Sequence, residues 1–218
     1  MSGDGLSLTG NAVTNSGGGM YLSGPATATI AASALDGNAA GSGGALTSYD
    51  ATLYLSGSSV STNTSNNGWG AGLLLSNTEG VVTSSTVSGN SGPSHGGGIF
   101  CNGGSIEFLS NSIERNSATL GGGGAFTNGS TATFSGNVVS GNHASGSAGG
   151  LYILNSAPTV AFSTISTNTA AQSGGGMWVY GGSPVIEDNA VSGNSAGWSG
   201  GGIRFTNDTS ATANTALA

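Results

Sequence analysis

Glycine and asparagine recur along this chain about every 26 residues, and this period restricts the fold more than any other feature. The glycines are spaced by 25, by 28 and then five times by 26 residues: Gly19, Gly44, Gly72, Gly98, Gly124, Gly150, Gly176 and Gly202. The asparagines form a second column: Asn38, Asn63, Asn90, Asn116, Asn142, Asn168 and Asn194. Two independent columns in register indicate a solenoid, in which each repeat stacks on the previous one.

Each repeat contains three short apolar segments separated by turn residues. The first follows the glycine, as in residues 20–22, and the second carries apolar pairs two positions apart, such as Ile106 and Phe108. The third carries one aliphatic residue per repeat: Leu35, Val60, Val87, Ile113, Val139, Ile165 and Val191. Alternation with period two indicates strands, and no segment shows the 3.6-residue period of an amphipathic helix.

The sequence therefore predicts an all-β fold, a right-handed parallel β-helix of about eight coils with three short strands per coil. We expect residues 1–218 to form one domain, as a fragment of a longer array or a repeat unit within it. Equivalent residues then stack at roughly 4.8 Å. The asparagines are expected to form an amide ladder at a turn, with a second ladder at another corner: Ser33, Ser58, Ser85, Asn111, Asn137, Ser163 and Asn189.

The charge balance excludes several classes of partner. Nine acidic residues stand against Arg115 and Arg204, there is no lysine, and the net charge is −7. Nucleic acids and anionic membrane surfaces attract basic groups, so neither is expected as a partner. No segment is apolar enough to insert into a membrane. Residues 1–20 show no basic segment followed by an apolar stretch, which predicts a cytosolic protein or a trimmed piece of a longer one.

Two short motifs alternate in the central repeats. One is a glycine pair followed by apolar residues, as in Gly123-Gly124-Ala125-Phe126, and the other is Phe-x-x-Asn, from Phe108 to Asn111 and from Phe134 to Asn137. This pairing resembles the repeats of polymorphic outer membrane proteins, whose autotransporter passenger regions are right-handed β-helices on bacterial surfaces. The resemblance covers nearly the whole chain, although only the fourth and fifth coils carry both motifs in full. It implies a secreted or surface-displayed passenger with an adhesive role.

The middle residue of the first strand is expected to face solvent, if its two neighbours face the core. That column reads Tyr21, Leu46, Leu74, Phe100, Phe126, Tyr152, Trp178 and Arg204. Stacked aromatic rings along a rod are suited to binding sugar rings or a protein surface. The predicted binding residues are Tyr21, Phe100, Phe126, Tyr152 and Trp178. The opposite assignment, with these rings inside the core, remains open.

Threonines on the second strand suggest an alternative function. Regular hydroxyl and methyl groups on a flat β-helix can order water, so an ice-binding face is one hypothesis. Its residues are Thr27, Thr29, Thr52, Thr131, Thr133 and Thr159. Glu79 and Glu107 interrupt the same face, and threonine is also common in exposed strands for its β-branching.

Paired carboxylates are the only candidates for chemistry. Glu79 and Glu107 lie on neighbouring coils, and Glu187 precedes Asp188. Such pairs serve glycoside hydrolysis or hold calcium, which makes a carbohydrate-active β-helix the first alternative. The coils are nearly uniform, and only residues 63–70 form a slightly expanded turn, so no cleft-forming insertion is expected. We therefore expect solvated surface acids, with Glu114 and Arg115 as a local ion pair, and no catalytic residue.

The remaining reactive side chains are isolated. His95 and His143 lie on different coils without a cysteine or second histidine at ligand spacing, so no metal site is expected. Cys101 is expected in the core, and nothing in the sequence calls for a cofactor. We expect a structural or adhesive module, whose partner is a polysaccharide or a protein surface. Because neither end carries a capping helix, we also expect self-association, end to end or laterally.

Overall fold

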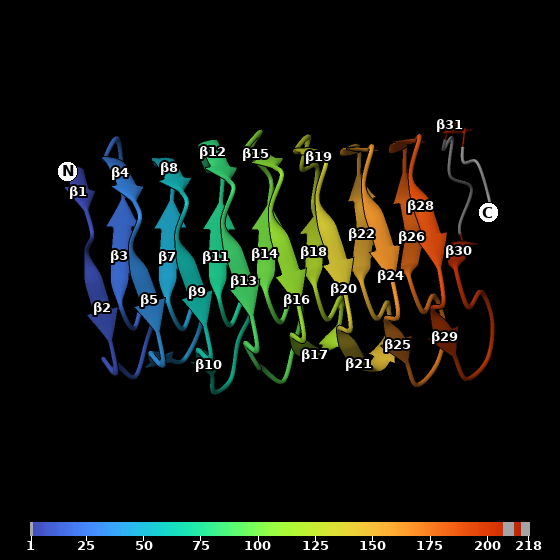
Figure 1. Ribbon diagram of the computed structural model, residues 1–218, viewed down its shortest axis with the longest axis horizontal. Helices are drawn as coiled ribbons and strands as arrows, with labels where there is room; N and C mark the ends of the chain where they lie inside the picture. The colour runs from blue at the N-terminus through green and yellow to red at the C-terminus, as the bar shows by residue number, and fades with distance from the viewer. Residues whose placement is uncertain (1, 207–211, 215–218) are drawn as a thin grey trace.

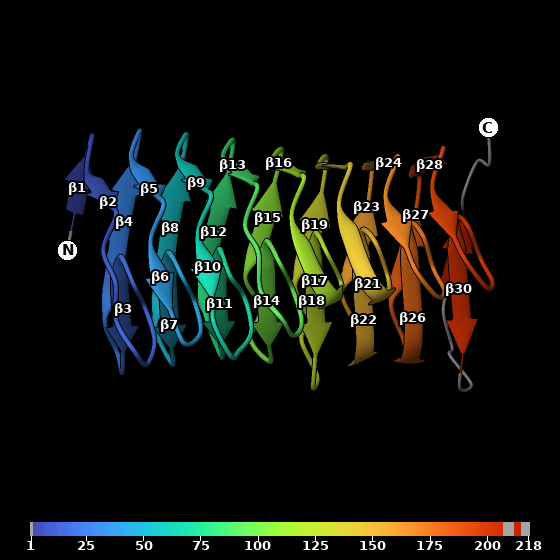
Figure 2. The same ribbon diagram turned by 90° about the horizontal axis from the view of Figure 1, so that it is seen from below.

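The computed structural model describes residues 2–206 and 212–214, and these form a rod of stacked coils built from strands (Figure 1). Successive coils follow one another along the long axis, as the colour gradient in both views shows (Figure 2). Three sheets run the length of the rod, and the strands in them pair in parallel with their equivalents in the neighbouring coils. The predicted all-β solenoid of about eight coils is confirmed.

Sheet 1 contains the strands that follow the glycine corner: β3 (Met20–Ser23), β7 (Leu46–Tyr49), β11 (Leu73–Ser76), β14 (Ile99–Asn102), β18 (Gly124–Thr127), β22 (Leu151–Ser156), β26 (Met177–Gly182) and β30 (Ile203–Thr206). Sheet 2 contains the next strands: β1 (Ser2–Asp4), β4 (Thr27–Ala31), β8 (Thr52–Ser56), β12 (Glu79–Thr83), β15 (Glu107–Leu109), β19 (Thr133–Ser135), β23 (Thr159–Ala161), β27 (Val185–Glu187) and β31 (Thr212–Asn214).

Sheet 3 closes the triangle with β2 (Ser7–Thr9), β5 (Ala34–Asp36), β9 (Ser59–Ser61), β13 (Thr86–Ser88), β16 (Ser112–Glu114), β20 (Val138–Ser140), β24 (Thr164–Ser166) and β28 (Ala190–Ser192). The sequence did not reveal a fourth set of short strands between sheets 3 and 1. This set comprises β6 (Ala39–Ala40), β10 (Thr64–Ser65), β17 (Ser117–Leu120), β21 (His143–Ser147), β25 (Thr169–Ala170) and β29 (Ser195–Ala196).

The core is a column of apolar side chains enclosed by the three sheets. The aliphatic residues predicted for the third strand are all buried, as is Cys101. At the centre, the rings of Phe108, Phe126 and Phe134 pack with centroids 5.8 to 6.0 Å apart, in tilted or edge-to-face orientations that suit aromatic pairs. Burial raises the pKa of the Cys101 thiol, which keeps it protonated and unreactive.

The asparagine ladder is present and runs through the buried turn after sheet 3. In each rung, the side-chain oxygen accepts hydrogen bonds from the backbone N–H and the amide of the preceding asparagine, as Asn142 does from Asn116 at 2.9 and 3.1 Å. The amide of Asn142 donates to the oxygen of Asn168 and to the carbonyl of Ile113. The ladder also begins one coil earlier than expected, at Asn11.

The shorter ladder of serines and asparagines is present between sheets 2 and 3. The backbone N–H of each member donates to the side-chain oxygen of the next, as from Ser85 to Asn111 at 3.0 Å and from Asn111 to Asn137 at 2.8 Å. Buried polar groups are thus paired at two corners of every coil. Within the described residues, only the hydroxyl of Ser130 is buried without a hydrogen-bond partner.

The residue before each ladder asparagine adopts a left-handed backbone. Glycine occupies this position in five coils, with φ between 62° and 67°: Gly10, Gly37, Gly89, Gly141 and Gly193. Non-glycine residues occupy it in three, namely Thr62, Arg115 and Thr167, with φ of 54° or 55°. A side chain with a Cβ costs about 1–2 kcal/mol in this conformation.

We therefore predict that Thr167→Gly raises the free energy of unfolding by about 1 kcal/mol. Thr167 is exposed, and its hydroxyl donates a hydrogen bond to the carbonyl of the adjacent Ser166, so little else is lost. Thr164→Gly is the matched control, since Thr164 is exposed in the middle of the same coil but lies in a strand, where glycine costs about 0.5–1 kcal/mol. Urea denaturation measures both. Destabilisation by Thr167→Gly would contradict the prediction.

The glycine column differs from the sequence prediction in two coils. Gly19 lies on Ala45, and Gly98 lies on Gly123, so Gly44 and Gly124 are each one position away from the column. A Cβ at Gly98 would come within 2.5 Å of the Gly123 carbonyl and 2.9 Å of the Asn116 amide, so close approach of neighbouring coils requires glycine there. A shift of one residue turns the following strand over.

Candidate functional site

The outward column of sheet 1 is the surface on which the predicted aromatic residues lie. The strand register gives Tyr21, Thr47, Leu74, Phe100, Ala125, Tyr152, Trp178 and Arg204. These side chains point away from the main core, because the neighbours Leu73 and Leu75 lie in that core and Leu74 does not. The prediction that the column faces solvent was wrong for most of it, since Thr47, Leu74, Phe100, Ala125 and Tyr152 are buried. Two expected members were wrong: Leu46 and Phe126 point inward, because the register in their coils is shifted by one residue.

Much of this outward column is covered by the chain itself. The flank loops, which we define as the segments between each ladder asparagine and the next glycine corner, fold over sheet 1 and form a second small core. Phe100 and Tyr152 are each only 5% exposed, Trp178 is half-buried, and Tyr21 at the first coil is 53% exposed. Leu120 and Ala148 of the flank loops pack into this cluster. The aromatic column therefore anchors the flank loops.

Polar contacts complete the cluster. The ring of His95 lies 5.9 Å from that of Tyr152, and burial lowers the pKa of His95. Burial also raises the pKa of Tyr152, with a smaller effect from Tyr180. At the end of the column, the guanidinium of Arg204 lies over the Trp178 ring at 5.6 Å from its centroid, a cation–π geometry.

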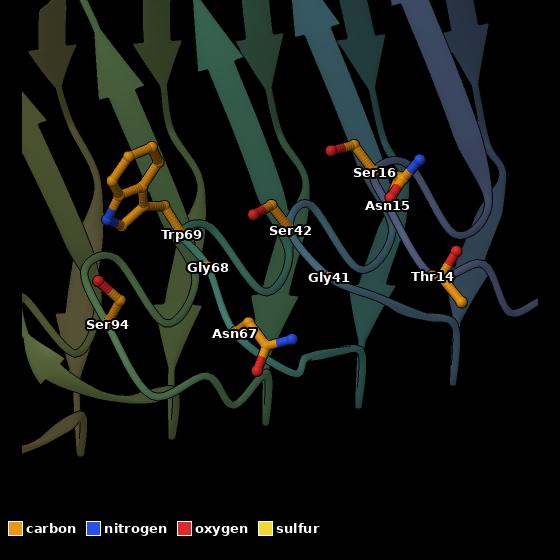
Figure 3. A pocket seen from close by; sticks show the side chains of 9 residues that line it. All are labelled: Thr14, Asn15, Ser16, Gly41, Ser42, Asn67, Gly68, Trp69 and Ser94. Carbon is orange, nitrogen blue, oxygen red and sulfur yellow. The ribbon is translucent and has the colours of Figure 1, made fainter.

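An open trough of about 590 Å³ lies across the flank loops of the first four coils (Figure 3). Six hydroxyl and amide side chains line it: Thr14, Asn15, Ser16, Ser42, Asn67 and Ser94. Its remaining walls are Gly41, Gly68 and the indole of Trp69, which stands at one end. Sequence reasoning missed this depression, because it expected no cleft near the expanded turn at residues 63–70.

Unequal loop lengths produce the trough. The ladder asparagine and the corner residue are seven positions apart in the second coil, from Asn38 to Ala45, and nine apart in the third, from Asn63 to Gly72. The short loop forms the floor and the long loop forms a wall. The two loops approach closely, since a Cβ at Gly68 would overlap the Ser42 hydroxyl. The difference in loop length is visible in the sequence, but it indicates a trough only once the stacking of the coils is known.

Trp69 is fixed in place by the second core. Its ring stacks on Phe100 with centroids 5.3 Å apart and planes inclined by 15°, and the side chain remains 46% exposed. Trp69 also lines a smaller recess of about 180 Å³ with His95, Phe100 and Asn128. The indole therefore separates two depressions on the same flank. A second tryptophan of the flank loops, Trp198, is 74% exposed.

The threonines proposed for ice binding lie on the outer face of sheet 2, but other residues break their columns. Thr27 pairs with Thr52, which pairs with Glu79. In the neighbouring column, Tyr54, Val81 and Glu107 separate Thr29 from Thr133 and Thr159. Thr131 is exposed beside Thr133. These residues share one face without forming an unbroken array.

The carboxylates are scattered over the rod, with Glu79, Glu107 and Glu187 on sheet 2 and Glu114 on sheet 3. Glu107 pairs with Val81, two positions beyond Glu79, so the two glutamates lie in adjacent columns. Asp188 sits at a left-handed corner after Glu187. Glu114 and Arg115 form the expected ion pair, and the pKa of Glu114 is lowered by hydrogen bonds from Ser112 and Arg115. None of these carboxylates lines the trough.

The side chains of the two histidines contact hydroxyl groups on different coils. His143 is exposed and contacts the Thr169 hydroxyl at 3.0 Å, whereas His95 contacts the Ser94 hydroxyl at 2.9 Å. In the part of the chain that the structure describes, no group of three or more His, Cys, Asp or Glu side chains is placed to hold a metal ion. Over the same residues, no helix has the length and apolar character needed to cross a bilayer.

Comparison with known proteins identifies the fold family. No curated protein and no solved structure matches the chain significantly. The model of the family described as "Right handed beta helix region" matches residues 2–139 and 112–216, which together span nearly the whole sequence. The stacked parallel strands agree with that description. The chain therefore belongs to the right-handed β-helix family.

Proposed function

We propose that this chain is a non-enzymatic, extracellular or cell-surface β-helix that serves as a structural and adhesive module. Its recognition surface is the flank formed by the loops before the glycine corners. The resemblance of its glycine-pair and Phe-x-x-Asn motifs to passenger repeats of polymorphic outer membrane proteins supports a displayed, adhesive role. Two buried side-chain ladders and three continuous sheets make the rod a rigid support for such loops.

The observation that carries this proposal is the presence of two exposed tryptophans on one flank. Trp69 and Trp198 are 46% and 74% exposed, and both lie in flank loops. Their coils are five steps apart, on the order of 24 Å at a spacing of about 4.8 Å. Tryptophan is enriched among the residues that contribute most of the binding energy at interfaces. A rigid rod with two such side chains can contact an extended surface at two points.

The proposal is tested by adhesion of beads coated with the chain to a panel of immobilised polysaccharides and matrix proteins. We expect retention on at least one surface, reduced at least tenfold by the double variant Trp69→Ala, Trp198→Ala. The matched control is Tyr54→Ala, Phe162→Ala, which removes two exposed aromatic rings from other faces. Equal loss in both pairs would contradict a flank-specific role. Product release from a polysaccharide that Glu79→Gln or Glu107→Gln abolishes would show an enzyme instead.

A further inference from the structure

We propose that the trough between the flank loops binds a neutral glycan chain, with Trp69 as the platform for one sugar ring. This inference rests on the proposed function, since it names the ligand of one part of the same flank. It comes from three observations: the chemistry of the lining side chains, the fixed indole at the end of the trough, and the distribution of charge.

The lining side chains offer hydrogen bonds without charge. Asn15 and Asn67 are exposed, and among the described residues neither side-chain amide is engaged in a hydrogen bond with the rest of the chain. Together with the Ser42 hydroxyl on the floor, they present donors and acceptors on both sides of the trough. Hydroxyl groups of a sugar both donate and accept, so they match amide and hydroxyl partners. A mainly apolar ligand would leave these groups unpaired.

Trp69 supplies an ordered apolar surface beside these polar groups. One face of its ring packs on Phe100, and the residue lines the trough and is 46% exposed to solvent. Because the ring is already held in place, binding loses little side-chain freedom there. The apolar face of a sugar ring packs well on such an aromatic face, while its hydroxyls reach the edges of the trough. Trp198 is also exposed, at 74%, but it does not line the trough, so it serves as the control tryptophan.

Charge favours a neutral polymer over an anionic one. No side chain that lines the trough is titratable, and the whole chain carries a net charge of −7. Both arginines lie elsewhere: Arg204 on Trp178 and Arg115 with Glu114. A uronic acid polymer would meet an acidic protein with no local cation. The trough crosses four successive coils, roughly 14 Å at about 4.8 Å per coil, which suits a chain of sugars more than one residue.

The test is affinity electrophoresis of the purified chain in gels containing one soluble polysaccharide each. The neutral probes are mixed-linkage β-glucan, xyloglucan and galactomannan, and the anionic probes are polygalacturonate and alginate. We expect retardation by at least one neutral probe and by neither anionic probe. Trp69→Ala is expected to weaken binding about tenfold or more, as for an aromatic anchor, and Asn67→Ala to weaken it severalfold. Trp198→Ala is the matched control and is expected to leave this binding unchanged.

A filling variant keeps the test valid if Trp69→Ala disturbs the second core. Asn15→Tyr adds volume to the trough from an exposed position two coils away from Trp69, and we expect it to abolish retardation with unchanged thermal unfolding. Several outcomes would overturn the inference: retardation in no neutral gel, preference for an anionic probe, or binding insensitive to both Trp69→Ala and Asn15→Tyr. If beads still adhere through Trp198, or to a matrix protein alone, the adhesive function stands without this ligand. If the unmodified chain shows no adhesion that depends on the flank loops, both the adhesive function and the glycan ligand are overturned.

Discussion

Replacing Asn142 with alanine is expected to lower the free energy of unfolding by about 4 kcal/mol. Its side chain occupies the middle of the asparagine ladder and is completely buried. The substitution leaves the backbone N–H and the amide of Asn116 without their acceptor, and removes the amide that the Ile113 carbonyl accepts from. Each buried polar group that loses its partner costs about 1–3 kcal/mol, which makes the sum large.

Two substitutions of the same type provide the controls for Asn142→Ala. Asn66 is exposed in a flank loop, so Asn66→Ala is expected to change stability by less than about 0.5 kcal/mol. Asn11 is exposed at the first rung and donates only to Asn38, so Asn11→Ala is expected to cost about 1 kcal/mol. Urea denaturation monitored by circular dichroism gives all three values. A cost for Asn142→Ala no greater than for Asn11→Ala would show that the ladder does not stabilise the rod.

The sequence was sufficient to predict the coil, because the coil depends on repeated local requirements. Every turn needs a residue whose side chain can bond the coils on both sides, and asparagine at a spacing of about 26 residues satisfies this, as Asn142 does. Every core position needs an apolar side chain at the same point of the coil, as in Ile113 and Val139. Because these requirements recur in every repeat, the assignment of turns and core positions in one repeat supports the same assignment in the others.

The register of two coils could not be obtained by aligning glycines. The consecutive glycines at 121–124 allow two alignments, and the one chosen from the glycine count placed Phe126 outside. The folded chain instead points Phe126 into the main core, between Phe108 and Phe134, and Ala125 into the second small core under the flank loops. In the second coil the same shift exchanges Leu46 for Thr47. A comparison of the apolar content of the two possible faces would have found both shifts.

The candidate site was predictable only in part, because it depends on irregular loops. Strand periodicity found the outward column with Tyr152 and Trp178, but not the loops that cover it. Loop lengths vary between seven and nine residues from ladder to corner, and the sequence contains no rule that says where such segments lie. The trough requires a short loop and a long loop in adjacent coils, which only the stacking of the coils reveals.

Substitution of Phe126 distinguishes the two registers with a large expected effect. In the structure, Phe126 is completely buried between Phe108 and Phe134, so Phe126→Ala is expected to cost about 3–5 kcal/mol, from lost burial and the cavity left behind. Phe162→Ala removes the same ring from a position that is 64% exposed and is expected to cost less than about 0.5 kcal/mol. Phe126→Leu retains most of the volume and is expected to fall between them, which keeps the measurement possible if the alanine variant does not fold. Chemical denaturation gives the three values, and a small cost for both Phe126 variants would place that side chain on the surface and overturn the register on which the core depends.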